Sequence, residues 1–217
     1  MAEDSMGGGR MNQQERVDVP RFSQEQWERD FSRRISLATP ADTARGVFCI
    51  GLLKAMEDLG GSEAARHCLQ ASGETAFVEL FSYPIATYLR MATTAVQLLS
   101  AKYGDIEESL RQLGRRAAAD FRESSAGRAL GVMHGSDARR LLDCLPVVYR
   151  IALSFGMYEL SWVEPAHARF RMERTFIPYP FHEGVLLELL EKTKVLGLKV
   201  RGRQTSALDS EYDICWG

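Results

Sequence analysis

Two stretches near the end of the chain alternate between apolar and polar side chains. In the range 156–163 every second residue from Tyr158 to Trp162 is apolar, and a repeat of two residues is typical of a half-buried strand. Pro165 predicts a turn after this strand, because proline presets its backbone angle and cannot extend a strand ladder. The alternation resumes over 170–176, so we expect the two strands to pair as an antiparallel hairpin.

The spacing then changes to that of a helix. Two prolines in the range 178–180 are expected to stop the second strand, and apolar residues over 185–195 recur three or four positions apart, as on one face of an amphipathic helix. Gly197 is expected to end this helix as a left-handed cap. Alternation over 198–203 and 211–216 predicts a second hairpin. The helix should therefore lie across one face of a four-stranded, mostly antiparallel sheet.

The preceding part of the chain, residues 42–154, follows a helical repeat throughout. Within it, Ser124 or Ser125 is expected to begin a short helix. A separate helix is predicted over 22–37, with Ser23 as its N-cap, because a serine hydroxyl can accept a hydrogen bond from the first turn.

These patterns predict one α+β domain with a tail. Residues 1–20 are polar and rich in glycine, which is typical of a disordered tail. Residues 21–41 should form an N-terminal helix and linker. Residues 42–216 should form a single domain, in which a helical bundle (42–154) packs on a strand-strand-helix-strand-strand unit (155–216).

Composition narrows the class of protein. The 217 residues are 45% hydrophobic and 26% charged, as in an ordinary globular protein, and the net charge of -2 argues against a protein whose main partner is nucleic acid. No apolar run approaches the roughly 18 residues of a membrane span, and the first residues do not read as a signal peptide. The four cysteines are scattered without metal-site spacing, which suits buried thiols in a reducing compartment. We therefore expect a cytoplasmic location.

Five short motifs carry a resemblance to a known family: Arg45-Gly46-Val47-Phe48, Phe81-Ser82-Tyr83-Pro84, Leu113-Gly114-Arg115-Arg116-Ala117, Phe181-His182-Glu183-Gly184-Val185 and Asp209-Ser210-Glu211-Tyr212. They resemble the Myxococcales-restricted family of paralogous proteins of unknown function, which are roughly 200 residues long. The resemblance covers about residues 43 to 216, and it implies no activity, because the family has none assigned.

A more distant resemblance follows from the order of the elements. Helices followed by strand-strand-helix-strand-strand are similar to the superfamily of haem-NO-binding (H-NOX) sensors, four-vinyl-reductase domains and TRAPP trafficking subunits, and this implies an H-NOX-like fold and self-association as a homodimer. Haem-NO sensors pair a proximal histidine with a Tyr-x-Ser-x-Arg motif, and none of the seven tyrosines here begins that motif. His134 and His182 lie near predicted helix ends where a haem ligand could sit, but a surface or hydrogen-bonded histidine is the commoner case. The cofactor, if any, stays unknown at this point.

Two groups of residues are candidate binding sites. Aromatic residues gather near the predicted junction of helices and sheet, where they could line an apolar pocket or simply form core. This candidate ligand site comprises Tyr83, Tyr88, Tyr149, Phe176, Tyr179, Phe181 and His182. Ser124, Ser125 and Arg128 would place hydroxyls, backbone N–H groups and a guanidinium at a helix start, which could hold an anion or be an ordinary N-cap.

No motif for catalysis is present. The sequence contains no nucleophile elbow, phosphate loop or zinc-binding cluster, so we expect that the protein is not an enzyme. The leading hypothesis is a regulatory or adaptor module that binds a small apolar ligand or a protein partner between the helices and the sheet. The alternatives are a haem-based gas sensor and a structural subunit of a larger complex.

Overall fold

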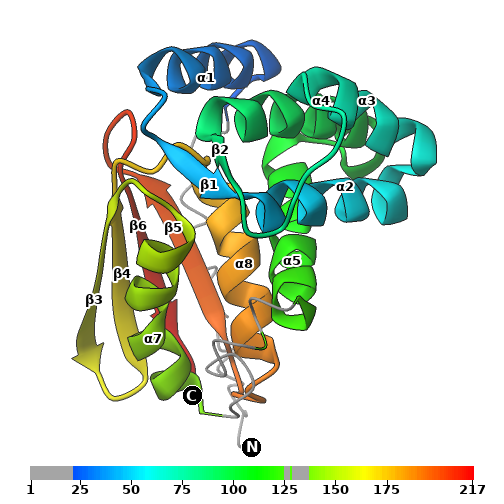
Figure 1. The fold of residues 1–217 in the computed structure, drawn as a ribbon. Helices are drawn as coiled ribbons and strands as arrows, with labels where there is room; N and C mark the ends of the chain where they lie inside the picture. The colour runs from blue at the N-terminus through cyan, green and yellow to red at the C-terminus, as the bar shows by residue number, and fades with distance from the viewer. Residues whose placement is uncertain (1–21, 125–127, 129–136) are drawn as a thin grey trace, which may run out of the picture.

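The computed structural model describes residues 22–124, 128 and 137–217 (Figure 1). The predicted tail, residues 1–20, lies outside this range. In chain order the described elements are α1 (Gln24–Leu37), β1 (Thr43–Arg45), α2 (Gly46–Gly60), α3 (Ser62–Ser72), β2 (Ser82–Pro84), α4 (Ile85–Tyr103), α5 (Ile106–Glu123), α7 (Ala138–Ala152), β3 (Met157–Glu164), β4 (His167–Glu173), α8 (Tyr179–Glu191), β5 (Lys199–Gln204) and β6 (Ser210–Cys215). None of the helices in these ranges is both long and apolar enough to cross a membrane.

The four long strands form one antiparallel sheet in the order β3-β4-β6-β5. Phe170 at the centre of β4 lies opposite Leu160 of β3 and Tyr212 of β6. Phe170 and Tyr212 are fully buried, whereas their chain neighbours on the other face are charged and partly exposed. The two predicted hairpins are confirmed, and so is the predicted helix between them.

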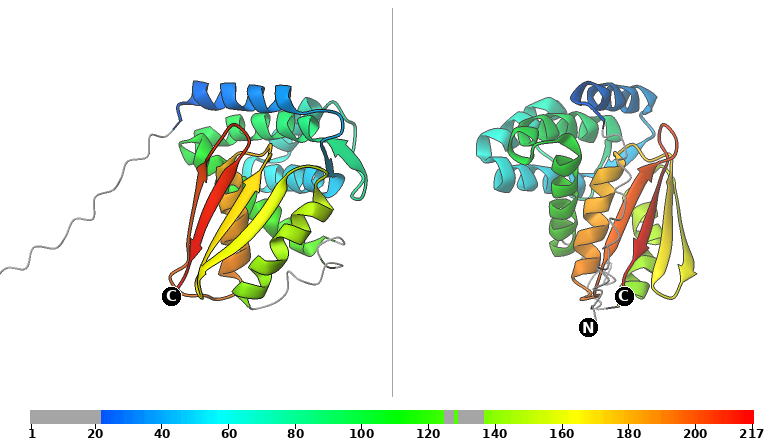
Figure 2. Two further views of the ribbon diagram at one scale, coloured as in Figure 1. Left: turned by 90° about the vertical axis from the view of Figure 1, so that its left-hand side faces the viewer. Right: turned by 180° about the vertical axis from the view of Figure 1, so that it is seen from behind.

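The sheet is covered on one side. Helices α7 and α8 lie against one face, while the other face is open in the described structure (Figure 2). Helix α5 packs along α8 on the side away from the sheet, and the helices α2, α3 and α4 form a group beyond it (Figure 1). The α+β architecture predicted from the pattern of the chain is therefore the observed one.

Small residues bring α5 and α8 unusually close together. A Cβ atom added to Gly114 of α5 would lie 1.9 Å from the carbonyl oxygen of Phe181, and one added to Gly184 of α8 would lie 2.0 Å from that of Arg111. Real Cβ atoms do not approach a carbonyl so closely, so both positions require glycine. The contact holds α8 at a fixed distance between the sheet and the helical part.

Glu183 of α8 links three elements. Its Oε1 accepts the backbone N–H of Gly202 on the edge strand β5 at 2.6 Å. Its Oε2 accepts from Nε of Arg111 on α5 at 2.8 Å. This buried carboxylate therefore ties the edge of the sheet to the helical part.

Helix α1 lies across one end of the molecule (Figure 1). Ser23 and Gln26 form a reciprocal capping box at its start, which confirms the predicted N-cap. Its buried face carries Trp27 and Phe31, and the guanidinium of Arg34 donates to the carbonyl oxygen of Thr175 at 3.2 Å. The helix is thus anchored to the loop between β4 and α8.

Three details differ from the sequence prediction. Helix α8 ends at Glu191, not at Gly197, because the chain turns there and Lys194 adopts a positive φ of 62°. Strand β4 ends at Glu173, because Arg174 has a φ of 52° that breaks the extended backbone. The short antiparallel pair β1–β2 was not predicted, because three-residue strands are too short for a pattern of alternation to be visible.

Candidate functional site

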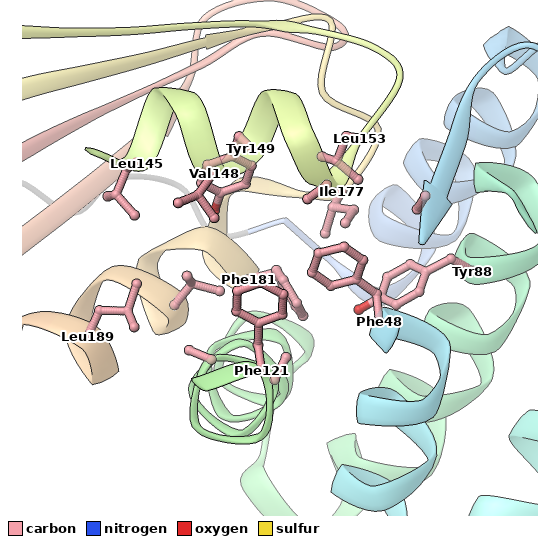
Figure 3. Close-up of a pocket in the computed structure, with 15 residues that line it drawn as sticks. Phe48, Tyr88, Phe121, Leu145, Val148, Tyr149, Leu153, Ile177, Phe181 and Leu189 are labelled. Carbon is pink, nitrogen blue, oxygen red and sulfur yellow. The ribbon is translucent and has the colours of Figure 1, made fainter. Parts of the chain in front are cut away.

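An apolar cavity of about 70 Å³ lies where the helical part meets α7 and α8 (Figure 3). Figure 3 shows Leu145 and Val148 of α7 on one side of it, and Leu189 of α8 and Phe121 of α5 on the other. Among the described residues, the lining is Ala44, Phe48, Tyr88, Ala117, Ala118, Phe121, Leu145, Val148, Tyr149, Ala152, Leu153, Ile177, Phe181, Val185 and Leu189.

Three of the predicted ligand-site residues line this cavity. Tyr88 comes from α4, Tyr149 from α7 and Phe181 from the first turn of α8. The Tyr88 and Phe181 rings meet edge to face with their centroids 6.4 Å apart. The junction of helices and sheet therefore does gather aromatic side chains around a space.

His182 lies buried behind the wall of the cavity. Its Nδ1 is 2.9 Å from the hydroxyl of Tyr149, and its Nε2 is 3.4 Å from Oγ1 of Thr175. Burial, together with the positive charge of Arg34, lowers the pKa of His182 to about 3. The imidazole is therefore neutral near pH 7, so that Nδ1 can accept from Tyr149 and Nε2–H can donate to Thr175.

Tyr149 presents its ring to the cavity and keeps its hydroxyl occupied. Burial, with a smaller contribution from Tyr158, raises the pKa of the Tyr149 phenol far above its ordinary range. The phenol therefore stays protonated and bound to His182. The surface that this wall offers to a ligand is apolar.

The other predicted ligand-site residues lie elsewhere. Phe176 is fully buried against Phe155, with ring centroids 5.0 Å apart, and Tyr179 packs near Trp27 of α1. The hydroxyl of Tyr83 accepts the backbone N–H of Val78 at 3.0 Å. These three side chains support the fold around the cavity but do not line it.

The prediction missed the stacked pair of Phe48 and Phe121. Their rings are 5.6 Å apart and nearly parallel, at 7°. It also missed Ala117 and Ala118 of α5, which leave room where larger side chains would fill the cavity. The run of three alanines that begins at Ala117 is a signal in the sequence, because small residues on a buried helix face allow either close packing or an empty space.

The candidate anion site is only partly described. Ser124 ends α5, where its hydroxyl donates to the carbonyl oxygen of Phe121 at 2.6 Å and its own carbonyl accepts from the backbone N–H of Arg128 at 3.0 Å. The guanidinium of Arg128 donates to the carbonyl of Glu123. Ser125 lies outside the described residues, so anion binding stays a prediction.

The described lining does not fit a haem. A haem iron needs an axial ligand such as histidine, cysteine, methionine or tyrosine. Of the fifteen lining residues, two could ligate iron, Tyr88 and Tyr149, and burial raises the pKa of both phenols far above their ordinary range. The cavity is also much smaller than the roughly 300 Å³ at which ordinary ligand pockets begin. His134, the other candidate haem ligand, lies outside the described residues.

Within the described ranges, no three His, Cys, Asp or Glu side chains are arranged to hold a metal ion.

A family model described as "Protein of unknown function (DUF2378)" matches residues 37–217. The match covers the whole predicted α+β domain, and the expectation of a family without an assigned function is confirmed. No curated protein matches the chain.

Solved structures of H-NOX proteins are similar in fold. The Fe(II) unliganded H-NOX protein from K. algicida superposes with a TM-score of 0.62 and 14% identity, over 80% of this chain and 96% of that chain. The H-NOX protein from S. oneidensis in the Fe(II)NO ligation state gives a TM-score of 0.61 and 13% identity, over 80% of this chain and 99% of that chain. At such identities the likeness concerns the fold alone, and it confirms the predicted H-NOX-like fold.

Proposed function

The chain belongs to the DUF2378 family of proteins of unknown function, and from this premise we propose that it is a non-catalytic regulatory module that binds a small apolar ligand. The single observation that carries the proposal is the cavity between α5, α7 and α8. Binding would be read out through α7 and α8, because these helices both line the cavity and cover the sheet.

The character of the lining supports this ligand class. The cavity is walled by aromatic rings and aliphatic side chains, and the hydroxyl of Tyr149 is turned to His182. Its volume of about 70 Å³ is roughly half that of an engineered apolar cavity, about 150 Å³, that stays dry and binds benzene or xenon. A small apolar molecule or the end of an alkyl chain fits such a space.

The haem-based gas sensor is the second candidate function. The H-NOX structures favour it, because their fold is shared over most of this chain. The described residues that line the cavity oppose it, because tyrosine is the one residue type among them that could ligate iron. We therefore rank it below an apolar ligand.

We place this module in the cytoplasm. A cytoplasmic location would keep the four free cysteines reduced, namely Cys49, Cys68, Cys144 and Cys215. Burial raises the pKa of Cys49 and Cys68 to about 12, so these two thiols behave as small apolar residues.

Native mass spectrometry of freshly purified protein, with an absorbance spectrum of the same sample, tests the proposal. A co-purified apolar mass without a Soret band supports it, and a Soret band with the mass of haem would replace it by the gas sensor. A protein that carries no ligand and takes up no benzene or xenon would contradict it. The remaining hypotheses would then be an adaptor for a protein partner, as monomer or homodimer, or a structural subunit.

A matched pair of variants tests the cavity itself. Ala118→Leu places its larger side chain in the cavity and should abolish uptake of benzene or xenon without loss of stability. Ala95→Leu is the control, because Ala95 is equally buried on α4 but does not line the cavity. We expect this control to cost about 1–3 kcal/mol of unfolding free energy by overpacking. Equal destabilisation of both variants in thermal or urea unfolding would show that the cavity is not available space.

A further inference from the structure

The apolar cavity shares part of its lining with a second space. A larger open groove of about 340 Å³ lies beside it, bounded by α7 and by β1, the start of α2 and the loop that precedes β2. Four residues line both spaces, namely Phe48, Phe121, Val148 and Ala152. These four residues therefore form the wall between the cavity and the groove.

The wall consists largely of the stacked Phe48 and Phe121 rings. Both side chains are only half-buried, and they come from different helices, α2 and α5. Side chains at partly exposed positions change rotamer rapidly. An elongated molecule could therefore lie in the groove and extend past the rings into the cavity.

The outer part of the groove combines apolar and charged side chains. Leu80 and Ile151 line it with 65% and 53% of their surfaces exposed. Arg45 and Glu79 lie at the same groove. A contiguous apolar surface with a polar rim is typical of a ligand-binding groove.

The guanidinium of Arg45 uses only one of its nitrogen atoms in the hydrogen bonds that the structure describes. Its Nη1 donates to the carbonyl oxygen of Leu80 at 2.9 Å and is 3.2 Å from Oγ of Ser82, and neither acceptor carries a charge. Arginine has five N–H donors, and the edge formed by Nε and Nη2 matches a carboxylate in a two-bond geometry. Within the described structure, this edge has no hydrogen-bonded partner among the contacts of Arg45.

The backbone adds to this positive potential. Arg45 is the N-cap of α2, whose first turn contains no acidic residue. The amino end of a helix carries partial positive charge, which favours an anion nearby. The N–H groups of Gly46 and Val47 in this turn already donate to the carbonyl oxygens of Phe81 and Glu79, so the guanidinium of Arg45 is the main positive group at the groove. The negative charge of Glu79 opposes it.

We infer that the ligand is an alkyl carboxylate, whose head binds Arg45 in the outer groove and whose tail passes Phe48 and Phe121 into the apolar cavity. This inference rests on the proposed function and names the chemical class of its ligand. It commits the groove to a small amphiphile and not to a protein chain.

Isothermal titration of the full chain with decanoate and with decanol tests the inference. Both probes have the same tail, so their difference reports the carboxylate. Decanoate should bind more tightly than decanol. Arg45→Gln should lower the affinity for decanoate about ten-fold or more and leave the affinity for decanol unchanged. Arg45→Lys should be intermediate, because it keeps the charge and loses the two-bond geometry. Thermal unfolding of each variant checks that the fold is intact.

Glu79→Gln provides a variant that should improve binding. Removal of its charge should raise the affinity for decanoate and leave the affinity for decanol unchanged. Ala118→Leu should lower the affinity for both probes. If decanol binds as well as decanoate, or Arg45→Gln changes neither, the carboxylate assignment is wrong while the apolar site stands. If neither probe binds and the protein also takes up no benzene or xenon, both this inference and the proposed function are wrong. Decanoate binding that survives Ala118→Leu would show that the tail does not enter the cavity.

Discussion

His182 is held without charge inside the core. It is 1% exposed, it lies between Tyr149 and Thr175, and the buried guanidinium of Arg34 comes from α1 to the adjacent loop. A charged imidazole there would lose its hydration and face a like charge, which is why the pKa falls. The sequence singled out His182 as a candidate ligand, but it could not show that α1 and α7 close over it, because those contacts come from distant parts of the chain.

Protonation of His182 should therefore oppose folding. The unfolded chain binds this proton below the ordinary pKa of 6.5, whereas the folded chain does so only at about pH 3. The free energy of unfolding should fall as the pH is lowered through this window, by up to about 1.4 kcal/mol per pH unit from this group. His182→Gln should make the pH dependence in urea unfolding shallower by that amount, because glutamine hydrogen-bonds but does not titrate.

If His182→Gln leaves the pH dependence of the unfolding free energy unchanged, the imidazole is not held neutral in the fold.

At the scale of elements, the crossing of α5 over α8 depends on the absence of two side chains. Gly114 and Gly184 let backbone meet backbone, and the Arg111–Glu183 ion pair lies beside them. Any side chain at these positions must push the helices apart. Since both helices line the cavity, their spacing also sets its width.

Gly114→Ala should destabilise the protein, although alanine is the better helix former. The added methyl group meets the carbonyl of Phe181, and we expect a loss of about 1–3 kcal/mol in urea unfolding. Gly51→Ala is the matched control in α2, where an added Cβ meets nothing within 4 Å. This control should gain up to about 1 kcal/mol from helix propensity. A stabilising effect at Gly114 would mean that the helices are not in contact there.

Local patterns of apolar and polar residues predicted most helices and strands. They failed where contacts between distant parts of the chain determine the structure. The hairpins could be predicted, because alternation and a tight turn act over a few residues. The end of α8 could not, because the half-buried Val195 reaches the core from the loop after the helix and so continues the apolar stripe. The cavity could be predicted only in part. Phe48 and Phe121 are separated by seventy-odd positions, and no local pattern shows that two such rings stack.

At the scale of the molecule, one core extends from α1 to the sheet. Trp27 and Phe31 of α1 belong to the same buried cluster as Phe170 and Tyr212. The guanidinium of Arg174 at the end of β4 also binds Asp42, which precedes β1, and it lowers the pKa of that carboxyl to about 2. Helix α1 lies almost entirely outside the match to the family model, which begins at residue 37, yet it buries Trp27, Phe31 and Arg34 against the rest of the protein.

The helical and sheet parts should therefore unfold together. The three tryptophans allow a test, because Trp27 lies in α1 while Trp162 and Trp216 meet edge to face at the sheet. A variant that keeps only Trp27 and one that keeps only Trp162 can each be followed by fluorescence and by far-ultraviolet circular dichroism. Within each variant the two signals should give the same urea midpoint, as in a two-state transition. An earlier midpoint for the fluorescence of Trp27 would show that α1 detaches on its own.

The carboxylate of Glu183 also has a consequence beyond the single molecule. Strand β5 is the last strand of its sheet, and an unpaired edge offers backbone groups to which a strand from another molecule can be added. Here the N–H of Gly202, midway along that edge, is already bound to Glu183, and α5 holds Glu183 in place through Arg111. A strand that tried to extend the sheet would have to break this contact and leave a buried carboxylate with one fewer donor. The side chain that joins the two halves of the fold thus also hinders the addition of a foreign strand at the β5 edge of the sheet.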